Sequence, residues 1–230
     1  MGFLIDGVRE AASLIAGGDA ATLHAVWVSL LCTCTAVGLA AVVAIPYGAW
    51  LGCYQPRARV QVVVLRMGTA VPTVVIGLLI YALLSRRGFL GDMDLLYTRT
   101  AIIAGEFVLA FPMLGTLAHG IAASLDPVVV ESSRTLGAGR GRALLRALGE
   151  CRPALAGACL AAFGRCITEL GIAVTVGGNL AMQTRTLPST IQLELSRGDF
   201  ARALAPGLIL LLLACIAAIV THRISGEARR

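Results

Sequence analysis

The residues best suited to chemistry follow an apolar run that ends near residue 176. A Gly-Gly pair there frees backbone N–H groups, and the polar side chains after it add hydrogen-bond donors. Backbone amides, hydroxyls and a guanidinium together suit an oxyanion. We therefore predict that a translocation path or gate includes Gly177, Gly178, Asn179, Thr184, Arg185 and Thr186. The alternative interpretation is an ordinary external loop that ends in a capped helix.

Two charged residues lie within the apolar run that precedes this segment. Arg165 and Glu169 are four residues apart, so they can pair on one helix. Charges at membrane depth cost about 2.5 to 3.5 kcal/mol each and usually face a bundle interior or a wet cavity. The sequence places the pair inside, as structural support or as part of a gate. Glu106, in an earlier run, is either protonated or matched by an arginine that the sequence does not identify.

Glycine recurs every seven residues in the same run, at Gly157, Gly164 and Gly171. This spacing puts the three residues close to one face of a continuous helix, where small residues let another helix approach closely. The repeat predicts a packing seam. The seam joins helices within one chain or joins two copies in a dimer, and the sequence favours neither.

Every basic residue of the chain is arginine, which excludes several kinds of chemistry. A Walker phosphate loop, a Schiff base and Ser-Lys catalysis each need a lysine. The seven cysteines include no C-x-x-C pair, so they indicate neither a zinc site nor a disulfide framework. We predict that the chain is not an enzyme and holds no metal or cofactor, so that any nucleotide is bound by another protein.

The composition predicts one all-α integral membrane domain. The chain has 230 residues, of which 57% are hydrophobic and 14% charged, and its mean hydropathy is +0.84. The apolar runs predict transmembrane helices at residues 22–52, 60–84, 100–124, 153–176 and 200–221. The sequence predicts an amphipathic helix in the membrane interface at residues 1–20, a transmembrane domain at residues 21–222 and a cytoplasmic tail at residues 223–230.

A polar stretch, residues 126–152, separates the third run from the fourth and is called the elbow below. Asp126 can cap a helix that begins at Val128 after Pro127, and Gly137 ends that helix. Residues 142–148 predict a second short helix. The stretch carries five arginines, and this charge places it on the cytoplasmic side.

Five spans put the two termini on opposite sides of the membrane. With the elbow inside, the N-terminus lies outside and the C-terminus in the cytoplasm. Arg86, Arg87 and Arg99 then lie outside, which is a mild violation of the charge rule that Asp92 and Asp94 partly offset. The net charge of +6 is explained by this orientation better than by nucleic-acid binding.

The elbow resembles the coupling helix of ABC importer permeases, in which a Glu, two small residues and a Gly dock into a cleft on the ATPase. The matching residues are Glu131, Ser132, Ser133, Arg134, Leu136, Gly137 and Ala138, with Ser-Ser where Ala-Ala is usual. Residues 70–78, 169–179, 184–187 and 194–200 are similar to permeases of the tungstate branch of oxyanion ABC importers.

This resemblance implies a type I ABC importer permease in the bacterial inner membrane. It implies a homodimer, two copies of a cytoplasmic ATPase that bind ATP and Mg, and an extracytoplasmic oxyanion-binding protein. The resemblance implies that the chain moves an oxyanion by alternating access, and it favours tungstate as that anion. Alternatives are a molybdate or sulfate permease, a proton-coupled carrier that uses Glu106 and Glu169, and a membrane enzyme that uses His119.

Overall fold

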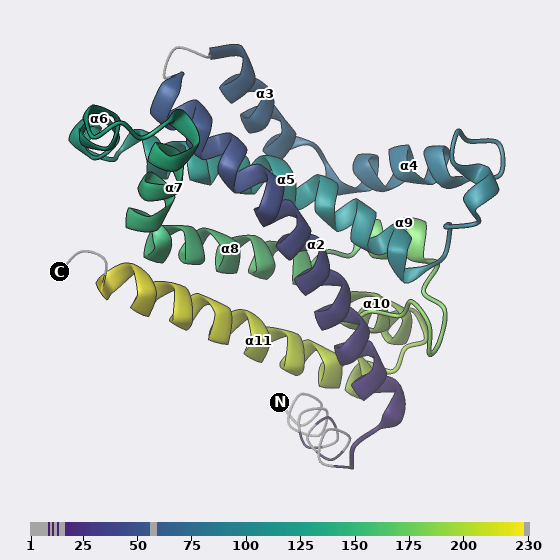
Figure 1. Cartoon of the computed structure of the whole chain (residues 1–230). Helices are drawn as coiled ribbons and strands as arrows, with labels where there is room; N and C mark the ends of the chain where they lie inside the picture. The colour runs from purple at the N-terminus through teal and green to yellow at the C-terminus, as the bar shows by residue number, and fades with distance from the viewer. Residues whose placement is uncertain (1–8, 10, 12, 14–16, 56–58, 228–230) are drawn as a thin grey trace. The chain divides into compact units, whose positions relative to one another are not determined.

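The structure is a computed structural model, and it describes residues 9, 11, 13, 17–55 and 59–227. Every regular element in these residues is a helix (Figure 1). The predicted interfacial helix at residues 1–20 falls largely outside the described residues, as do Arg57, Arg229 and Arg230.

Three long helices match three of the predicted spans within a few residues. They are α2 (Ala20–Tyr54), α5 (Arg99–Ala123) and α11 (Phe200–Glu227), and each is long and apolar enough to cross a membrane. Asp199 accepts a hydrogen bond from the backbone N–H of Arg202 and so caps the last helix.

The other two predicted spans are bent pairs of helices and not continuous ones, so that part of the prediction was wrong. The first pair is α3 (Arg59–Ala70) and α4 (Thr73–Leu84), interrupted at Pro72. The second pair is α8 (Arg152–Ile167) and α9 (Gly171–Gly177), whose axes differ by 60°. Counting each pair as one span gives up to five spans in the described part of the chain.

Short helices lie between the spans. They are η1 (Gly91–Met93), α6 (Pro127–Thr135), α7 (Arg140–Glu150) and α10 (Leu187–Ser196). The elbow contains α6 and α7, which pack against each other, and α10 follows the segment predicted to line the path (Figure 1).

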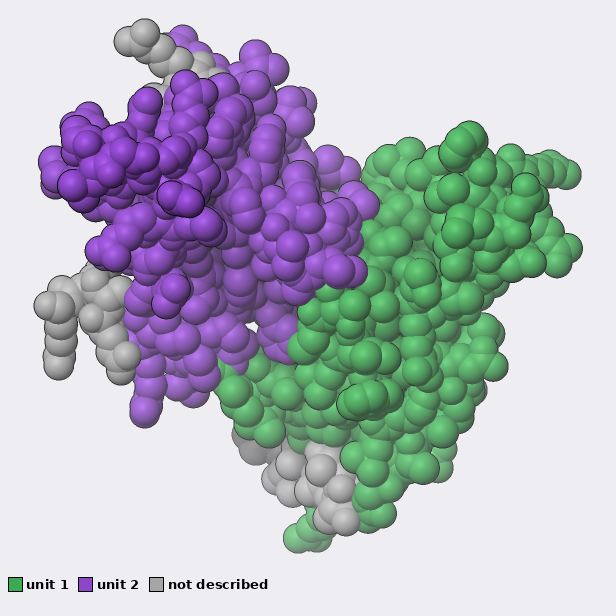
Figure 2. Space-filling model, viewed as in Figure 1, with its two compact units in different colours: residues 1–36, 72–106, 164–216 green, residues 37–71, 107–163, 217–230 purple. Residues whose placement is uncertain are grey.

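The chain forms two compact units, each built from three stretches of sequence (Figure 2). Unit 1 contains residues 1–36, 72–106 and 164–216, and unit 2 contains residues 37–71, 107–163 and 217–230. The long helices contribute residues to both units, whereas α4, α9 and α10 belong to unit 1 and the elbow to unit 2.

Unit 1 is held together by close helix contacts and by backbone hydrogen bonds between distant segments. In it, α4 packs against α9, where Gly77 leaves room for the side chain of Thr175. The backbone N–H of Tyr97 donates to the carbonyl of Val176 at 2.8 Å. The N–H of Leu187 donates to the hydroxyl of Ser29, which ties α10 to α2 at 2.8 Å. Within this unit the loop before α5 therefore meets the end of α9, and the start of α10 meets α2.

Unit 2 packs α2 and α3 on α5 through small residues. Gly48 of α2 lies against the backbone of Gly115, and Gly68 of α3 lies against the ring of Pro112. A small apolar core below these contacts includes Ala118, Cys151, Leu155, Ile45, Ile121, Leu125 and Leu148. The glycine contacts set the position along α5 at which α3 packs.

The seven-residue glycine repeat does not form the continuous seam that its spacing predicted. The break after Ile167 separates Gly171 from Gly157 and Gly164, so the three residues are not on one helix. A Cβ atom added at Gly164 would meet nothing within 4 Å, whereas Gly171 contacts Thr73 and Val74. A dimer seam at Gly157 and Gly164 stays a prediction.

Candidate functional site: the elbow, the helix break and the polar loop

The elbow has the local structure that its sequence predicted. The carboxylate of Asp126 accepts a hydrogen bond from the N–H of Val128 at 2.9 Å, and Pro127 occupies the first turn of α6. The helix ends at Thr135, and Gly137 adopts a left-handed conformation with φ of 85°. The second helix, α7, begins at Arg140, two residues before the predicted start. Gly139, the residue before this helix, has an extended backbone conformation, so the helix begins directly after it.

The surface of α6 is largely exposed, although this helix packs against α7. No residue of α6 is buried, and the side chain of Leu136 just after it is 88% exposed. Glu131 and Arg134 make no side-chain ion pair within the described residues, and both line a cavity of about 320 Å³. By contrast, α7 buries Ala143 and Ala147, and the hydroxyl of Tyr54 donates to the carbonyl of Arg140. Within the elbow, α7 is therefore anchored to the rest of unit 2, whereas α6 is exposed and available to a partner.

Arg165 and Glu169 do form the predicted ion pair, with Nη1 and Oε2 at 2.7 Å. They do not share one helix as predicted, because α8 ends at Ile167 and Glu169 lies in the break. The other carboxylate oxygen of Glu169 accepts the backbone N–H of Gly171, at the start of α9, at 2.9 Å. Glu169 is 6% exposed, so this carboxylate satisfies a buried N–H that the break leaves without a helical partner.

Glu106 is more deeply buried than Glu169 and is unpaired. It is 3% exposed, and no arginine lies within ion-pair distance in the described residues. One of its oxygens has no hydrogen-bond partner there, and the same is true of the neighbouring hydroxyl of Thr33. The arginine partner that the sequence allowed is therefore not found within the described residues.

The donors of residues 177–186 are used mainly inside the loop, which corrects the prediction that they are free. The N–H of Gly178 donates to Val174, and Thr184 donates to the carbonyl of Gly177 and accepts the N–H of Leu180. Thr186 caps α10 in a reciprocal arrangement with Ser189. Loop residues form these local bonds because a buried backbone group without a partner is costly. The capped-helix interpretation is therefore correct for the local structure.

Arg185 is the loop residue that keeps an available charge. Its Nε donates to the side-chain oxygen of Asn179 at 3.1 Å and its Nη2 to the carbonyl of Asn179 at 3.3 Å. No carboxylate lies within 4.0 Å of this guanidinium in the described structure. Both groups that it contacts are neutral, so its positive charge is not compensated.

Arg185 lines a cavity of about 230 Å³ in unit 1, together with residues from α2, α10 and α11. The other charged groups there have partners: Arg197 pairs with Glu194 at 3.1 Å and Arg202 with Asp199 at 3.4 Å. Asp19 accepts hydrogen bonds from the side chain and the backbone of Thr22, which lower the pKa of this carboxyl. Arg185 is therefore the arginine of this cavity without an ion pair in the described residues, and Asp19 is a carboxylate of the same cavity that also has none. The guanidinium keeps donors that a small anion could use.

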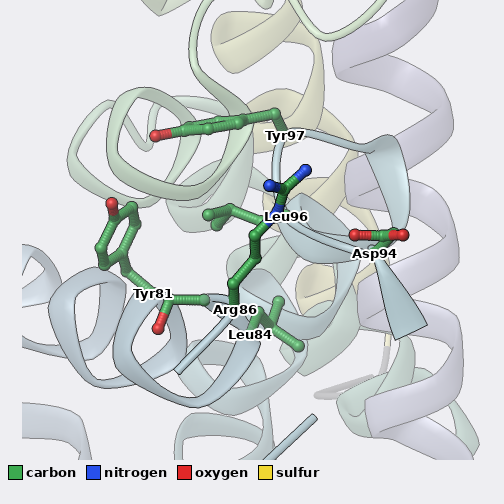
Figure 3. Close-up of a pocket in the computed structure, with 7 residues that line it drawn as sticks. Tyr81, Leu84, Arg86, Asp94, Leu96 and Tyr97 are labelled. Atoms are coloured by element: carbon green, nitrogen blue, oxygen red, sulfur yellow. The ribbon is translucent and has the colours of Figure 1, made fainter. Parts of the chain in front are cut away.

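A second cavity in unit 1, of about 460 Å³, lies between the end of α4 and the loop that precedes α5 (Figure 3). Tyr81 and Tyr97 line it with their ring centroids 6.5 Å apart, and the side chain of Arg86 extends towards Tyr97. Asp94 and Tyr97 have positive φ values, 46° and 63°. Neither conformation was predicted from the sequence. Aspartate is enriched at positive φ, so position 94 carried a weak signal, whereas tyrosine at position 97 gave none.

Arg66 of α3 is a further charge that the sequence analysis missed. It is exposed in unit 2 and makes no ion pair within the described residues. The signal was present, since Arg66 is the one charged residue in the apolar run of residues 60–84.

These features define a class of protein. The chain combines long apolar helices with a polar helical elbow between two of them, and its own residues satisfy the backbone groups at the helix breaks. This is the architecture of a multi-pass membrane subunit that moves a solute. One solved chain with this fold belongs to the MetNI methionine ABC transporter in inward-facing conformations. It matches with a TM-score of 0.72 and 17% identity, covering 91% of this chain and 97% of that chain.

Sequence comparison gives the family. Residues 44–230 match the family described as the binding-protein-dependent transport system inner membrane component, and the chain belongs to it. The tungstate uptake system permease protein TupB of Peptoclostridium acidaminophilum is 32% identical over 99% of this chain and 100% of that protein. TupB of Campylobacter jejuni subsp. jejuni is 31% identical, over 96% and 93%. The chain is thus the translocating permease subunit of an ABC importer and not an enzyme.

The carboxylate of Glu169 is expected to stabilise the bend between α8 and α9. Glu169→Ala removes both the ion pair and the partner of the Gly171 N–H, and should lower the free energy of unfolding by about 1.5 to 3 kcal/mol. Glu169→Gln keeps an acceptor for the N–H and should cost less. Thermal unfolding in detergent, followed by circular dichroism, measures both changes.

Glu150→Gln is the matched control for this pair. Glu150 also pairs with an arginine four residues away, Arg146, at 2.6 Å, but both side chains are exposed. Its loss should change stability by no more than about 0.5 kcal/mol. Equal unfolding temperatures for Glu169→Ala and Glu150→Gln would show that the break does not depend on the carboxylate.

Proposed function

We propose that this permease imports an oxyanion and that the anion is tungstate. The observation that carries the proposal is similarity over essentially the whole chain to two tungstate uptake permeases. The uncompensated guanidinium of Arg185, beside a cavity in the polar loop, supports an anionic cargo. Molybdate and sulfate are tetrahedral oxyanions of the same charge, so they are the alternatives to be tested.

The proposed assembly follows from the family. Two copies of the chain enclose the path, each elbow contacts one cytoplasmic ATPase that binds ATP and Mg, and an extracytoplasmic binding protein delivers the anion. The elbow lies in the cytoplasm with the C-terminus, and the N-terminus lies outside the inner membrane. The exposed α6 supports this role, because a helix with no buried residue and a protruding Leu136 is available to a partner.

Alternating access is the proposed mechanism. Closure of the ATPases on ATP moves the elbows, and this motion turns the dimer from inward-open to outward-open, after which hydrolysis resets it. The elbow can transmit such a motion because α7 is anchored through Ala143, Ala147 and the Tyr54 hydrogen bond. Movement of α6 is thereby passed to the spans.

Anion selectivity tests the proposed function directly. Vesicles that contain the permease, its ATPase and its binding protein should accumulate tungstate on addition of ATP, and at equal concentrations should accumulate less molybdate and still less sulfate. Uptake is measured by elemental analysis of washed vesicles. Uptake that continues without ATP or without the ATPase would instead indicate a secondary carrier, and a preference for sulfate would contradict the assignment of tungstate.

Charge reversal at Glu131 tests the coupling surface. Glu131→Arg should abolish ATP-driven uptake and remove the stimulation of ATPase activity by the loaded binding protein, because the carboxylate is exposed and free to contact the ATPase. Glu150→Gln, on the anchored helix of the elbow, is the control and should retain both activities. Uptake that survives Glu131→Arg would support a carrier that does not need the elbow.

The charge of Arg185 is expected to matter for anion flux. Arg185→Gln should lower uptake about tenfold, the loss expected for one hydrogen bond to a charged group. Arg185→Lys keeps the charge but loses the Nε contact with Asn179, so it should retain most of the flux if the charge is what the anion meets. Arg87→Gln, outside the cavity, is the control. Equal losses in the Lys and Gln variants would show that Arg185 only shapes the loop.

A further inference from the structure

Two arginines, Arg99 and Arg185, differ from the others in their exposure. Both side chains are half-buried, whereas every other arginine that the structure describes is exposed. Neither has a carboxylate within 4.0 Å in the described residues. Both donate instead to backbone carbonyls of the same segment, the polar loop of residues 177–186. Hydrogen bonds from a charged donor are about twice as strong as neutral ones, so these two side chains are suited to holding this loop in place.

Arg99 joins the polar loop to two long helices. Its Nε donates to the carbonyl of Gln183 at 2.8 Å, and its Nη2 lies 3.4 Å from Nε2 of His24, near the start of α2. The second contact is a hydrogen bond when Nε2 of His24 carries no proton. Arg99 is also the first residue of α5, and its carbonyl lies 4.0 Å from Sγ of Cys32 in α2. One residue thus connects α2, α5 and the loop, all within unit 1.

The polar loop needs contacts from outside because its backbone is strained. Asn179 and Met182 have φ values of 51° and 56°, in the left-handed region that residues other than glycine seldom adopt. The N–H groups of residues 183–185 all donate to one carbonyl, that of Leu180, at 3.1 to 3.2 Å. Strain of this kind persists only where the surrounding structure holds it. The contact between Arg99 and Gln183 comes from such a surrounding element.

The segment that ends at Arg99 also holds the start of the loop. Two residues earlier, the N–H of Tyr97 donates to the carbonyl of Val176 at 2.8 Å, and Gly178 leaves room for the ring of Tyr97. The chain from Tyr97 to Arg99 therefore contacts the loop region at its start and again at Gln183. These two points enclose the strained residues.

We propose that Arg99 is a positioning residue for anion transport. Arg185 follows Gln183 by two residues, so the contact made by Arg99 fixes the part of the loop from which Arg185 projects. Arg99 is not among the described residues that line the Arg185 cavity, so it acts on the anion through Arg185. This inference rests on the proposed function, because it takes the cargo to be an oxyanion that meets Arg185.

A double-mutant cycle tests whether Arg99 acts through Arg185. ATP-driven uptake of tungstate is measured in vesicles that contain the complete importer. Arg99→Gln should lower uptake about tenfold, and Arg99→Lys should recover part of the loss because an ammonium group can still donate to the Gln183 carbonyl. The double variant, Arg99→Gln with Arg185→Gln, should be no lower than Arg185→Gln alone. A double variant that loses about a hundredfold would show that the two arginines act independently, and would overturn the inference.

Hydrogen exchange of the loop amides gives a readout that does not depend on transport. In Arg99→Gln the N–H groups of residues 183–185 should exchange about tenfold faster than in the wild-type importer, because the loop loses a hydrogen bond from a charged group. Exchange in α11 should stay unchanged, which excludes general unfolding. Lowered uptake with unchanged exchange in the loop would show that Arg99 does not hold it, and would overturn the inference.

Arg87→Gln is the matched control. Arg87 is also in unit 1 and has no ion pair in the described residues, but its side chain is exposed. This variant removes one positive charge and should leave both uptake and loop exchange unchanged, and equal losses in Arg87→Gln and Arg99→Gln would overturn the inference. Normal uptake by Arg99→Gln would overturn it as well, whereas failure of the wild-type importer to move any oxyanion would refute the proposed function.

Discussion

The constraint on which this structure depends is that lipid offers no hydrogen bonds to a broken helix. A span can bend only where the protein itself satisfies the freed backbone groups. At the first break Pro72 has no N–H to satisfy, and its carbonyl accepts from Val75 and Ile76. At the second break the carboxylate of Glu169 accepts the N–H of Gly171 while it pairs with Arg165. The two bends are therefore tolerated for different chemical reasons.

The same constraint separates the charges of the chain into two groups. Arg165, Arg197 and Arg202 each have a carboxylate within 4.0 Å, and these pairs hold local structure together. Arg185 has none in the described residues, and neither do many other arginines, such as Arg59, Arg66 and Arg134. Arg185 differs from these in lining the unit 1 cavity next to the polar loop. If the cargo is the proposed anion, the charges without a partner matter more than the total of +6. A paired guanidinium would have to give up its carboxylate before it could bind cargo.

The features that the sequence predicted well are those set by local chemistry. The elbow was predicted within two residues at each end because Asp126, Pro127 and Gly137 act on neighbouring backbone groups. Length and hydropathy likewise located α2, α5 and α11. The break at residues 168–170 was missed because no proline marks it and its acceptor is a side chain that was predicted to lie on the helix. The loop donors were wrongly predicted to be free because the bonds of Thr184 form only once the loop has folded.

The way in which the polar loop would hold an anion bears on how selectivity is divided within the proposed importer. A site that encloses an oxyanion with many donors would bind it tightly and release it slowly, whereas conduction requires sites that the solute can leave. Most donors of the loop are used within the loop, and Arg185 is left with neutral partners, so the loop would provide a single charged contact and no cage. In the proposed importer, discrimination between tetrahedral oxyanions would therefore fall mainly to the binding protein. The elbow would then have to couple the opening of the path to the ATPase cycle.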